Sequence, residues 1–245
     1  MFLKKHGPYP IIIGGWAVYT YNSYSGSVDI DVVGPSMGGY FNNYLTQFQI
    51  ANGYEEIHLG ELGIEKGFQK AIYENGEKIG QMEIDACSYE ADLKYFHENT
   101  GKILPYSLCD RATLQKVLVL PEGAEVIIPD KSLLVLYKIK ALRDRKYDYE
   151  NNRLISAARK TWLEGKITKD ASDIIALLDP KPSSFLLEGQ INPKTIREIV
   201  GEFDISFMLD SLDDLTSMKA SLKKYRDVRK EDVAEWVHNI KRELI

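Results

Sequence analysis

The stretch Ile11–Val33, IIIGGWAVYTYNSYSGSVDIDVV, carries more information about this chain than any other segment. A run of isoleucines ends at the pair Gly14-Gly15, and a second apolar segment further on includes Asp29 and Asp31. Side chains alternate along a strand, so two aspartates separated by one residue point to the same face. Two carboxylates on one face repel each other, and a divalent cation with oxygen ligands is the natural partner between them.

The Gly14-Gly15 pair predicts a turn that binds phosphate. Its backbone N–H groups have no side chain in front of them, and the helix expected over residues 16–22 begins beside them. A metal-binding aspartate pair next to such a turn is typical of phosphoryl or nucleotidyl transfer.

A third carboxylate is expected from Gln81–Cys87, QMEIDAC, near the end of a strand over residues 78–87. If this strand lies beside the strand of the aspartate pair, Asp85 completes a two-metal site. Glu83 shares the face of Asp85, but Asp85 is favoured because it lies closer to the end of the strand. The alternative is that Glu83 and Asp85 only form the solvent face of a half-exposed strand.

The charge distribution predicts an acidic part followed by a basic part. The chain has 245 residues, is 44% hydrophobic and carries a formal net charge of −5. Residues 1–129 contain 9 basic and 16 acidic side chains, residues 130–245 contain 22 and 20, and residues 138–169 contain 10 and 4. This division suits a metal–triphosphate substrate, although a solvated helix surface explains the basic residues as well. The overall acidity disfavours a long nucleic-acid duplex, which is bound through many Lys and Arg contacts to phosphate.

The cysteines and the hydropathy exclude other classes of site. Cys87 and Cys109 have no partners at the spacing of zinc ligands, so a zinc site is not expected. No signal peptide and no membrane helix are expected, since no segment approaches the roughly 20 apolar residues that a membrane helix needs. We therefore expect a cytoplasmic location without a membrane partner.

The apolar patterns predict an α+β fold: a small mixed sheet with flanking helices, followed by an α-helical domain. The boundary is expected between residues 129 and 130, where Pro129-Asp130 marks a change in the apolar period. In the first part we expect strands over residues 11–13, 27–33, 68–73, 78–87, 116–120 and 124–128, and a helix over 40–52. The dipeptide Asn75-Gly76 predicts a hairpin turn. In the second part we expect helices from residue 131 and over 147–163, 169–178, 193–202, 216–225 and 230–243.

The order of strand, Gly-Gly, helix and Asp-x-Asp strand resembles the nucleotidyltransferase superfamily typified by DNA polymerase β. The resemblance covers roughly residues 8–90. Gly14 and Gly15 match the turn of that superfamily, and Asp29 and Asp31 match its metal-binding aspartates. Asp85 matches the third carboxylate, and Ser27 matches the usual Ser or Thr before the first aspartate. The chain departs from the pattern at Ser25, where many members carry a basic residue. Another residue must then hold the triphosphate, or the substrate differs.

The helical part resembles the later motifs of the AbiEii-type nucleotidyltransferases. Lys138 matches the family lysine, Lys169 stands where Arg is usual, and Asp170 and Asp173 match the two family aspartates. That family includes toxins of toxin–antitoxin pairs, some of which act on tRNA acceptor ends. The resemblance implies that these residues bind the nucleotide.

The residues themselves leave alternatives open. Lys138 is expected on a helix face between apolar side chains, from which its ammonium could reach a phosphate, or it is an ordinary residue at the fringe of an amphipathic helix. Asp170 and Asp173 are one helical turn apart and could orient Lys138 or the acceptor. Alternatively, Asp170 is only a favourable charge in the first turn of a helix that Thr168 caps. Tyr24 could stack on a base, although such aromatic side chains more often belong to the core.

Together these features predict a nucleotidyltransferase that moves an NMP from an NTP to an acceptor hydroxyl and releases pyrophosphate. The expected cofactor is Mg²⁺ at a two-ion site, with Mn²⁺ as an alternative, held by Asp29, Asp31 and Asp85. Lys138 is expected to join these three as a catalytic residue. The residues expected to bind the nucleotide are Gly14, Gly15, Ser27, Lys138, Asp170 and Asp173.

The acceptor stays open between tRNA, a small molecule and a protein. One alternative function is a toxin that uses tRNA as acceptor and has an antitoxin partner. The other is a degenerate protein that binds a nucleotide or a partner without turnover.

Overall fold

The computed structural model of the chain describes residues 10–35, 39–57, 66–89, 95–121 and 123–244. The contacts divide the chain into two compact units. Unit 1 comprises Met1–Ala17, Ser25–Leu93 and Pro105–Asp130, and unit 2 comprises Val18–Tyr24, Lys94–Leu104 and Lys131–Ile245. The two short segments Val18–Tyr24 and Lys94–Leu104 thus belong with the helical part, although they precede the boundary expected from the sequence.

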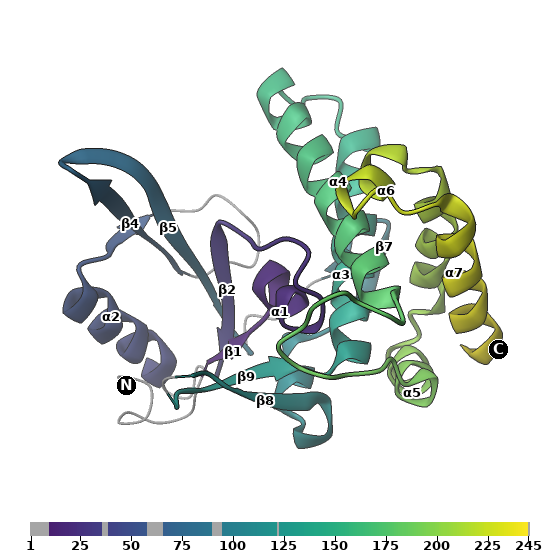
Figure 1. The fold of residues 1–245 in the computed structure, drawn as a ribbon, viewed down its shortest axis with the longest axis horizontal. Coiled ribbons are helices and arrows are strands. Elements are labelled where there is room, and N and C mark those ends of the chain that lie inside the picture. The colour runs from purple at the N-terminus through teal and green to yellow at the C-terminus, as the bar shows by residue number, and fades with distance from the viewer. Residues whose placement is uncertain (1–9, 36–38, 58–65, 90–94, 122, 245) are drawn as a thin grey trace. The chain divides into compact units, whose positions relative to one another are not determined.

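Unit 1 is built on a seven-stranded mixed sheet (Figure 1). In their order across the sheet, the strands are β3 (Glu55–Ile57), β4 (Lys66–Glu74), β5 (Glu77–Ser88), β2 (Asp29–Gly34), β1 (Ile11–Ile12), β9 (Glu125–Pro129) and β8 (Gln115–Val119). The pairs β2·β5 and β1·β9 are parallel, and the other pairs are antiparallel. The general α+β class and the mixed character of the sheet are therefore as predicted.

The hairpin between β4 and β5 turns at the predicted dipeptide. Asn75 and Gly76 both have positive φ, 52° and 86°. Two consecutive residues in the left-handed region make the turn that matches the twist of the flanking strands, and Asn-Gly is the sequence most suited to it. The local sequence thus sets the register of the two longest strands of the sheet.

The core of unit 1 lies on one face of the sheet, beneath α2 (Tyr40–Asn52). Val32 on β2, Phe68 on β4 and Ile84 on β5 point to this face and pack with Phe41 and other residues of α2. Because side chains alternate, the opposite face of β2 and β5 carries the acidic residues that lie between these apolar ones. Packing of α2 therefore decides which way the carboxylates point.

Unit 2 is largely helical. Its elements are α3 (Lys131–Asn151), α4 (Ala157–Leu178), α5 (Pro193–Phe203), the 3-10 helix η5 (Ser206–Ser217), α6 (Lys219–Lys224), α7 (Lys230–Leu244) and the small hairpin of β6 (Tyr95–Phe96) and β7 (Asn99–Ile103). Helix α1 (Gly14–Tyr21) begins in unit 1 and ends in unit 2, and the 3-10 helices η3 (Tyr106–Asp110) and η4 (Ala112–Leu114) belong to unit 1. In the described part of the chain, no helix is both long and apolar enough to cross a membrane.

Two of the predicted helices, over residues 147–163 and 169–178, are wrong. The first helix continues to Asn151, and α4 then runs without a break from Ala157 to Leu178. Ser156 caps α4 by accepting a hydrogen bond from the backbone N–H of Arg159. Polar helix-capping chemistry, rather than apolar spacing, sets this break. The apolar pattern also did not predict β3, β6, β7 or η5.

Gly34, the last residue of β2, provides a test of the core packing. A Cβ at this position would lie 2.5 Å from the ring of Phe41, which is 2% exposed. We expect Gly34→Ala to lower the free energy of unfolding by about 1–3 kcal/mol, because the ring has no space to move. Urea denaturation of the purified protein measures this effect.

Gly80→Ala on β5 is the matched control, since a Cβ there meets no atom within 4 Å. A methyl group in an open strand position should leave the stability unchanged or raise it by about 0.5–1 kcal/mol. Equal losses for the two variants would contradict the packing of α2 on β2.

Candidate functional site

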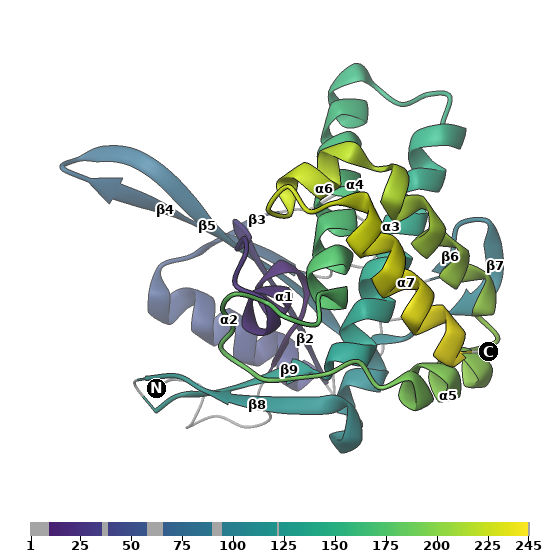
Figure 2. The ribbon, with the colours of Figure 1, turned by 45° about the vertical axis from the view of Figure 1, so that its right-hand side comes forward.

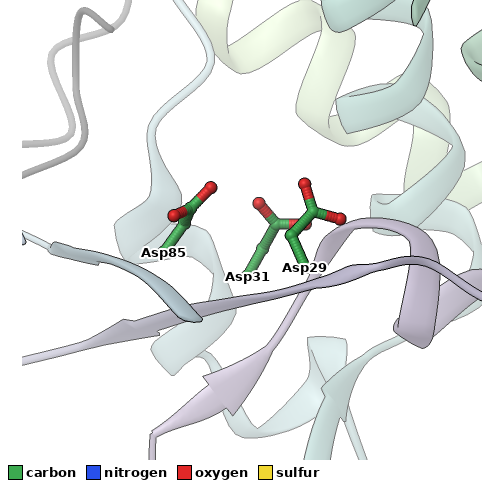
Figure 3. A group of neighbouring side chains, drawn as sticks. All are labelled: Asp29, Asp31 and Asp85. Carbon is green, nitrogen blue, oxygen red and sulfur yellow. The ribbon is translucent and has the colours of Figure 1, made fainter. Parts of the chain in front are cut away.

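Three carboxylates gather on the face of the sheet opposite α2. Strands β2 and β5 are parallel and pair in register, with Asp31 beside Asp85 and Asp29 beside Glu83. One carboxylate oxygen from each of Asp29, Asp31 and Asp85 lies within 4.8 Å of the others. Figure 3 shows the three side chains rising from the same side of the two strands. The predicted metal ligands therefore lie together.

Glu83 shares this face but is not part of the group. Its carboxylate accepts a hydrogen bond from the side-chain amide of Gln81, two residues earlier on the same strand. The structure thus brings Asp85, and not Glu83, to the aspartate pair. This is the arrangement favoured from the position of Asp85 near the end of the strand.

Gly14 lies against the side chain of Asp31, and Ser27 contacts Asp29. Gly14 has a φ of +68°, and a Cβ on it would overlap the carboxylate of Asp31. The backbone N–H of Ile13, just before it, donates to the backbone oxygen of Asp31 at 2.9 Å. The hydroxyl of Ser27 donates to Asp29, which is 8% exposed. Glycine is therefore required at position 14 both by the backbone conformation and by the contact with Asp31.

The N-terminus of α1 consequently lies against Asp31, because the helix begins at Gly14. The first backbone N–H groups of a helix have no partner within it and carry a partial positive charge. Gly15, the second residue of α1, is buried. A carboxylate beside a helix N-terminus is stabilised, and the same N–H groups suit a phosphate oxygen.

The group of carboxylates fits a hard divalent cation. Three negative charges this close repel one another, and a cation with oxygen ligands removes the repulsion. Carboxylate oxygens are ligands of Mg²⁺ and Mn²⁺, whereas soft metals select sulfur or imidazole. In this structure Asp29, Asp31 and Asp85 could hold such an ion.

Unit 2 contains a second charged cluster, buried between α3 and α4. Lys138 on α3 is 9% exposed, and its ammonium lies 2.7 Å from Asp173 and 3.4 Å from Asp170. Arg145, also on α3, forms an ion pair with Asp170. Asp170 and Asp173 are 2% and 0% exposed. Both carboxylates are therefore shielded from water and paired with basic side chains.

Lys169 and Tyr24 complete the cluster, which we call the buried ion network: Tyr24, Lys138, Arg145, Lys169, Asp170 and Asp173. The ammonium of Lys169 and the hydroxyl of Tyr24 both bond to the same oxygen of Asp173. Burial, with the nearby charge of Asp173, raises the pKa of Tyr24, so the phenol remains a donor. Burial lowers the pKa of Lys169, although Asp173 opposes the shift. With all five charged members ionised, the network holds three cations and two anions.

The structure decides between the sequence interpretations of this cluster. Lys138 is buried and paired, so it is not a fringe lysine of an amphipathic helix. Thr168 lies inside α4 and is not a cap, so the interpretation of Asp170 as a first-turn charge is wrong. Asp170 and Asp173 instead contact Lys138, as expected if they orient it.

Two members of the network were not assigned to it from the sequence. Arg145 lies two helical turns after Lys138, and this spacing could have placed both on one face of α3. Tyr24 meets Asp173 across 149 residues of sequence, and no local pattern indicates such a contact.

Gly14→Ala tests the contact between the glycine turn and Asp31. We expect a loss of about 1–3 kcal/mol in the free energy of unfolding beyond that of a matched control, since the new methyl group must displace the carboxylate. The control is Gly53→Ala, because Gly53 has the same φ of +68° but open space around a Cβ. In both variants the alanine must adopt the left-handed backbone conformation, which lowers stability. Equal free energies of unfolding for the two variants would contradict the close contact between Gly14 and Asp31. Chemical denaturation of both proteins supplies the comparison.

Asp170 predicts a specific dependence of stability on pH. Burial alone would raise the pKa of its carboxyl, but Arg145 and Lys138 outweigh burial and hold the pKa below its usual value. Ionised Asp170 therefore stabilises the fold above the ordinary aspartate pKa of about 4, and this contribution is lost as the pH falls through the lower folded value.

We expect Asp170→Asn to lower the stability at pH 7 by about 3–5 kcal/mol, because Lys138 and Arg145 lose a buried charged partner. The gap in free energy of unfolding between the variant and the unchanged protein should narrow as the pH falls below about 4. Denaturation curves from pH 7 downward measure the gap, with the exposed Asp210→Asn as control. A gap that stays constant with pH would contradict the assigned ion pairs.

No family model matches the chain, and no curated protein matches it.

Proposed function

We propose that this protein is a Mg²⁺-dependent nucleotidyltransferase of the DNA polymerase β type, which transfers an NMP from an NTP to an acceptor hydroxyl. The observation that carries the proposal is the group of Asp29, Asp31 and Asp85, whose carboxylate oxygens lie within 4.8 Å of one another. The N-terminus of α1 beside Asp31 supports it, since it offers N–H groups to a phosphate next to the metal ligands.

Each residue of the site has a role in the proposed reaction. Asp29 and Asp31 hold the cation, with Asp29 fixed by the hydroxyl of Ser27. A bound Mg²⁺ supplies positive charge to the phosphate oxygens. Asp85 is a third ligand or takes the proton of the acceptor hydroxyl. The acceptor oxygen forms a bond to the α-phosphorus, and the bond to the pyrophosphate oxygen breaks.

In the same proposal, Lys138 contributes positive charge to the triphosphate. Its support is the match of Lys138 to the lysine of the AbiEii-type motif, together with its ion pairs to Asp170 and Asp173. Asp170 and Asp173 then act as positioning residues that hold the ammonium of Lys138. In the alternative function, the protein is a toxin and the acceptor of the NMP is tRNA. The chemical step is the same in both functions.

The proposal predicts nucleotide binding that depends on the three carboxylates. We expect one or more of the four NTPs to bind in the presence of Mg²⁺, and binding to weaken at least tenfold in the Asp29→Asn/Asp31→Asn double variant and in Asp85→Asn. The reason is that an amide oxygen carries no negative charge and therefore binds a divalent cation more weakly than a carboxylate does. Calorimetric titration of each NTP, with and without Mg²⁺, measures this.

Glu83→Gln is the matched control, because Glu83 lies on the same face, two residues from Asp85, with its carboxylate held by Gln81. It should bind as the unchanged protein does. Transfer of label from the α-phosphate of the bound NTP to RNA, protein or small hydroxyl compounds then identifies the acceptor. Transfer that survives in the double aspartate variant would refute the proposal, and failure of every NTP to bind would favour a partner-binding protein without turnover.

A further inference from the structure

The far part of the β4–β5 hairpin extends beyond its neighbours in the sheet. Strand β3 pairs with β4 only at residues 67–69, and β2 pairs with β5 only at residues 83–88. Residues 70–74 and 77–82 therefore form a two-stranded ribbon, which continues past α2 (Figure 1 and Figure 2). Among the described residues, no strand pairs with either outer edge of this ribbon.

The two edges of the ribbon are not equivalent. Ile72 pairs with Gly80 and Tyr73 with Lys78, so Ile79 is an extra residue on β5. A bulge of this kind interrupts the row of backbone groups on its own strand and is a common protection of an edge. Strand β4 is regular over the same stretch, so its edge is the one that can accept a further strand.

Apolar side chains are exposed on this ribbon. Ile72 is 38% exposed, Tyr73 65%, Ile79 60% and Met82 39%. Ile72 and Met82 lie on the face that α2 covers nearer the base of the hairpin, where Phe68 and Ile84 are buried. The apolar face of the sheet thus continues beyond the helix that covers it. Exposed apolar residues that share a face, as Ile72 and Met82 do, are a feature of interaction surfaces.

The charges of β4 show which partner fits. In an antiparallel pairing of residues 70–74 with the same residues of another copy, Ile72 lies opposite Ile72 of the partner subunit. Lys70 then lies opposite Glu74 of the partner subunit, and the pair occurs twice by symmetry. Lys70, Ile72 and Glu74 share one face, so each of these pairs is a direct cross-strand neighbour. Ala71 falls opposite the large Tyr73 of the partner subunit on the other face.

We propose that the edge of β4 over residues 70–74 binds a second copy of this chain as an antiparallel strand, which joins two sheets across a twofold axis. The segment is bounded by Glu55 of β3, which pairs with Gln69, and by the turn at Asn75-Gly76. Its length of five residues is short for a dimer interface, so the association should be weak and depend on concentration. This inference does not rest on the proposed nucleotidyl transfer.

Charge reversal tests the register of this dimer. We expect the protein to form a reversible dimer in sedimentation equilibrium, and Lys70→Glu and Glu74→Lys each to weaken it by roughly tenfold, because each variant places like charges opposite each other twice. An equimolar mixture of the two variants should dimerise again, since each Glu of one chain then faces a Lys of the other. High salt should weaken the dimer of the unchanged protein and the mixed dimer.

Glu77→Lys is the control for net charge, because it changes the same charge on the bulged strand β5 and should leave the dimer unaffected. Lys70 also donates to the backbone oxygen of Asn52 at 2.7 Å, so Lys70→Glu could unfold the end of α2. In that case the register is tested by comparing the dimer affinity of Glu74→Lys with that of Glu77→Lys. A monomer at every concentration up to several hundred micromolar, a dimer that Glu74→Lys leaves intact, or folded variants that do not pair when mixed would each overturn the proposal.

Discussion

The parallel, in-register pairing of β2 with β5 is the constraint on which both the core and the candidate site of unit 1 depend. It sets Asp31 beside Asp85 and, one residue on, Val32 beside Ala86. A shift of the register by one residue would turn every side chain of a strand to the other face. The carboxylates would then meet α2, and the apolar residues would lie on the opposite face of the sheet. Burial of the core under α2 therefore also secures the geometry of the acidic group.

The charged clusters of the two units differ in the partners of their carboxylates. In unit 1, three carboxylates lie together, with the hydroxyl of Ser27 bonded to Asp29 and the N-terminus of α1 beside Asp31. In unit 2, two nearly fully buried aspartates each meet more than one basic side chain. Buried charges are tolerated only with such partners. The acidic group of unit 1 could hold a divalent cation, whereas basic side chains of unit 2 neutralise its buried aspartates.

Local chemistry explains what could be predicted from the sequence and what could not. The alternation around Asp29 and Asp31 and the Asn75-Gly76 turn are local patterns, and β2 and the hairpin appear where they predict them. Helix α2 likewise spans the residues 40–52 that the apolar pattern predicts. The ends of α3 and α4 were misplaced, because apolar spacing continues across a break that Ser156 sets by capping. The contact of Tyr24 with Asp173 joins residues far apart in sequence, so only the fold reveals it. The expected chemistry of both clusters stays a prediction, since geometry places the side chains but does not name the substrate.

Strand β5 connects the candidate metal centre to the open ribbon. It is 12 residues long, twice the length of β2, which covers only its second half. The half of β5 that pairs with β2 carries Asp85. The other half pairs only with β4 and forms the ribbon. A two-stranded ribbon alone is only marginally stable, so a strand added at its edge would also stiffen it. Because Gly67, the residue of β4 beside Asp85, is already enclosed between β3 and β5, an added strand at residues 70–74 would leave the acidic group as it is. The proposed association and the proposed metal binding would therefore be separable, although both use the same hairpin.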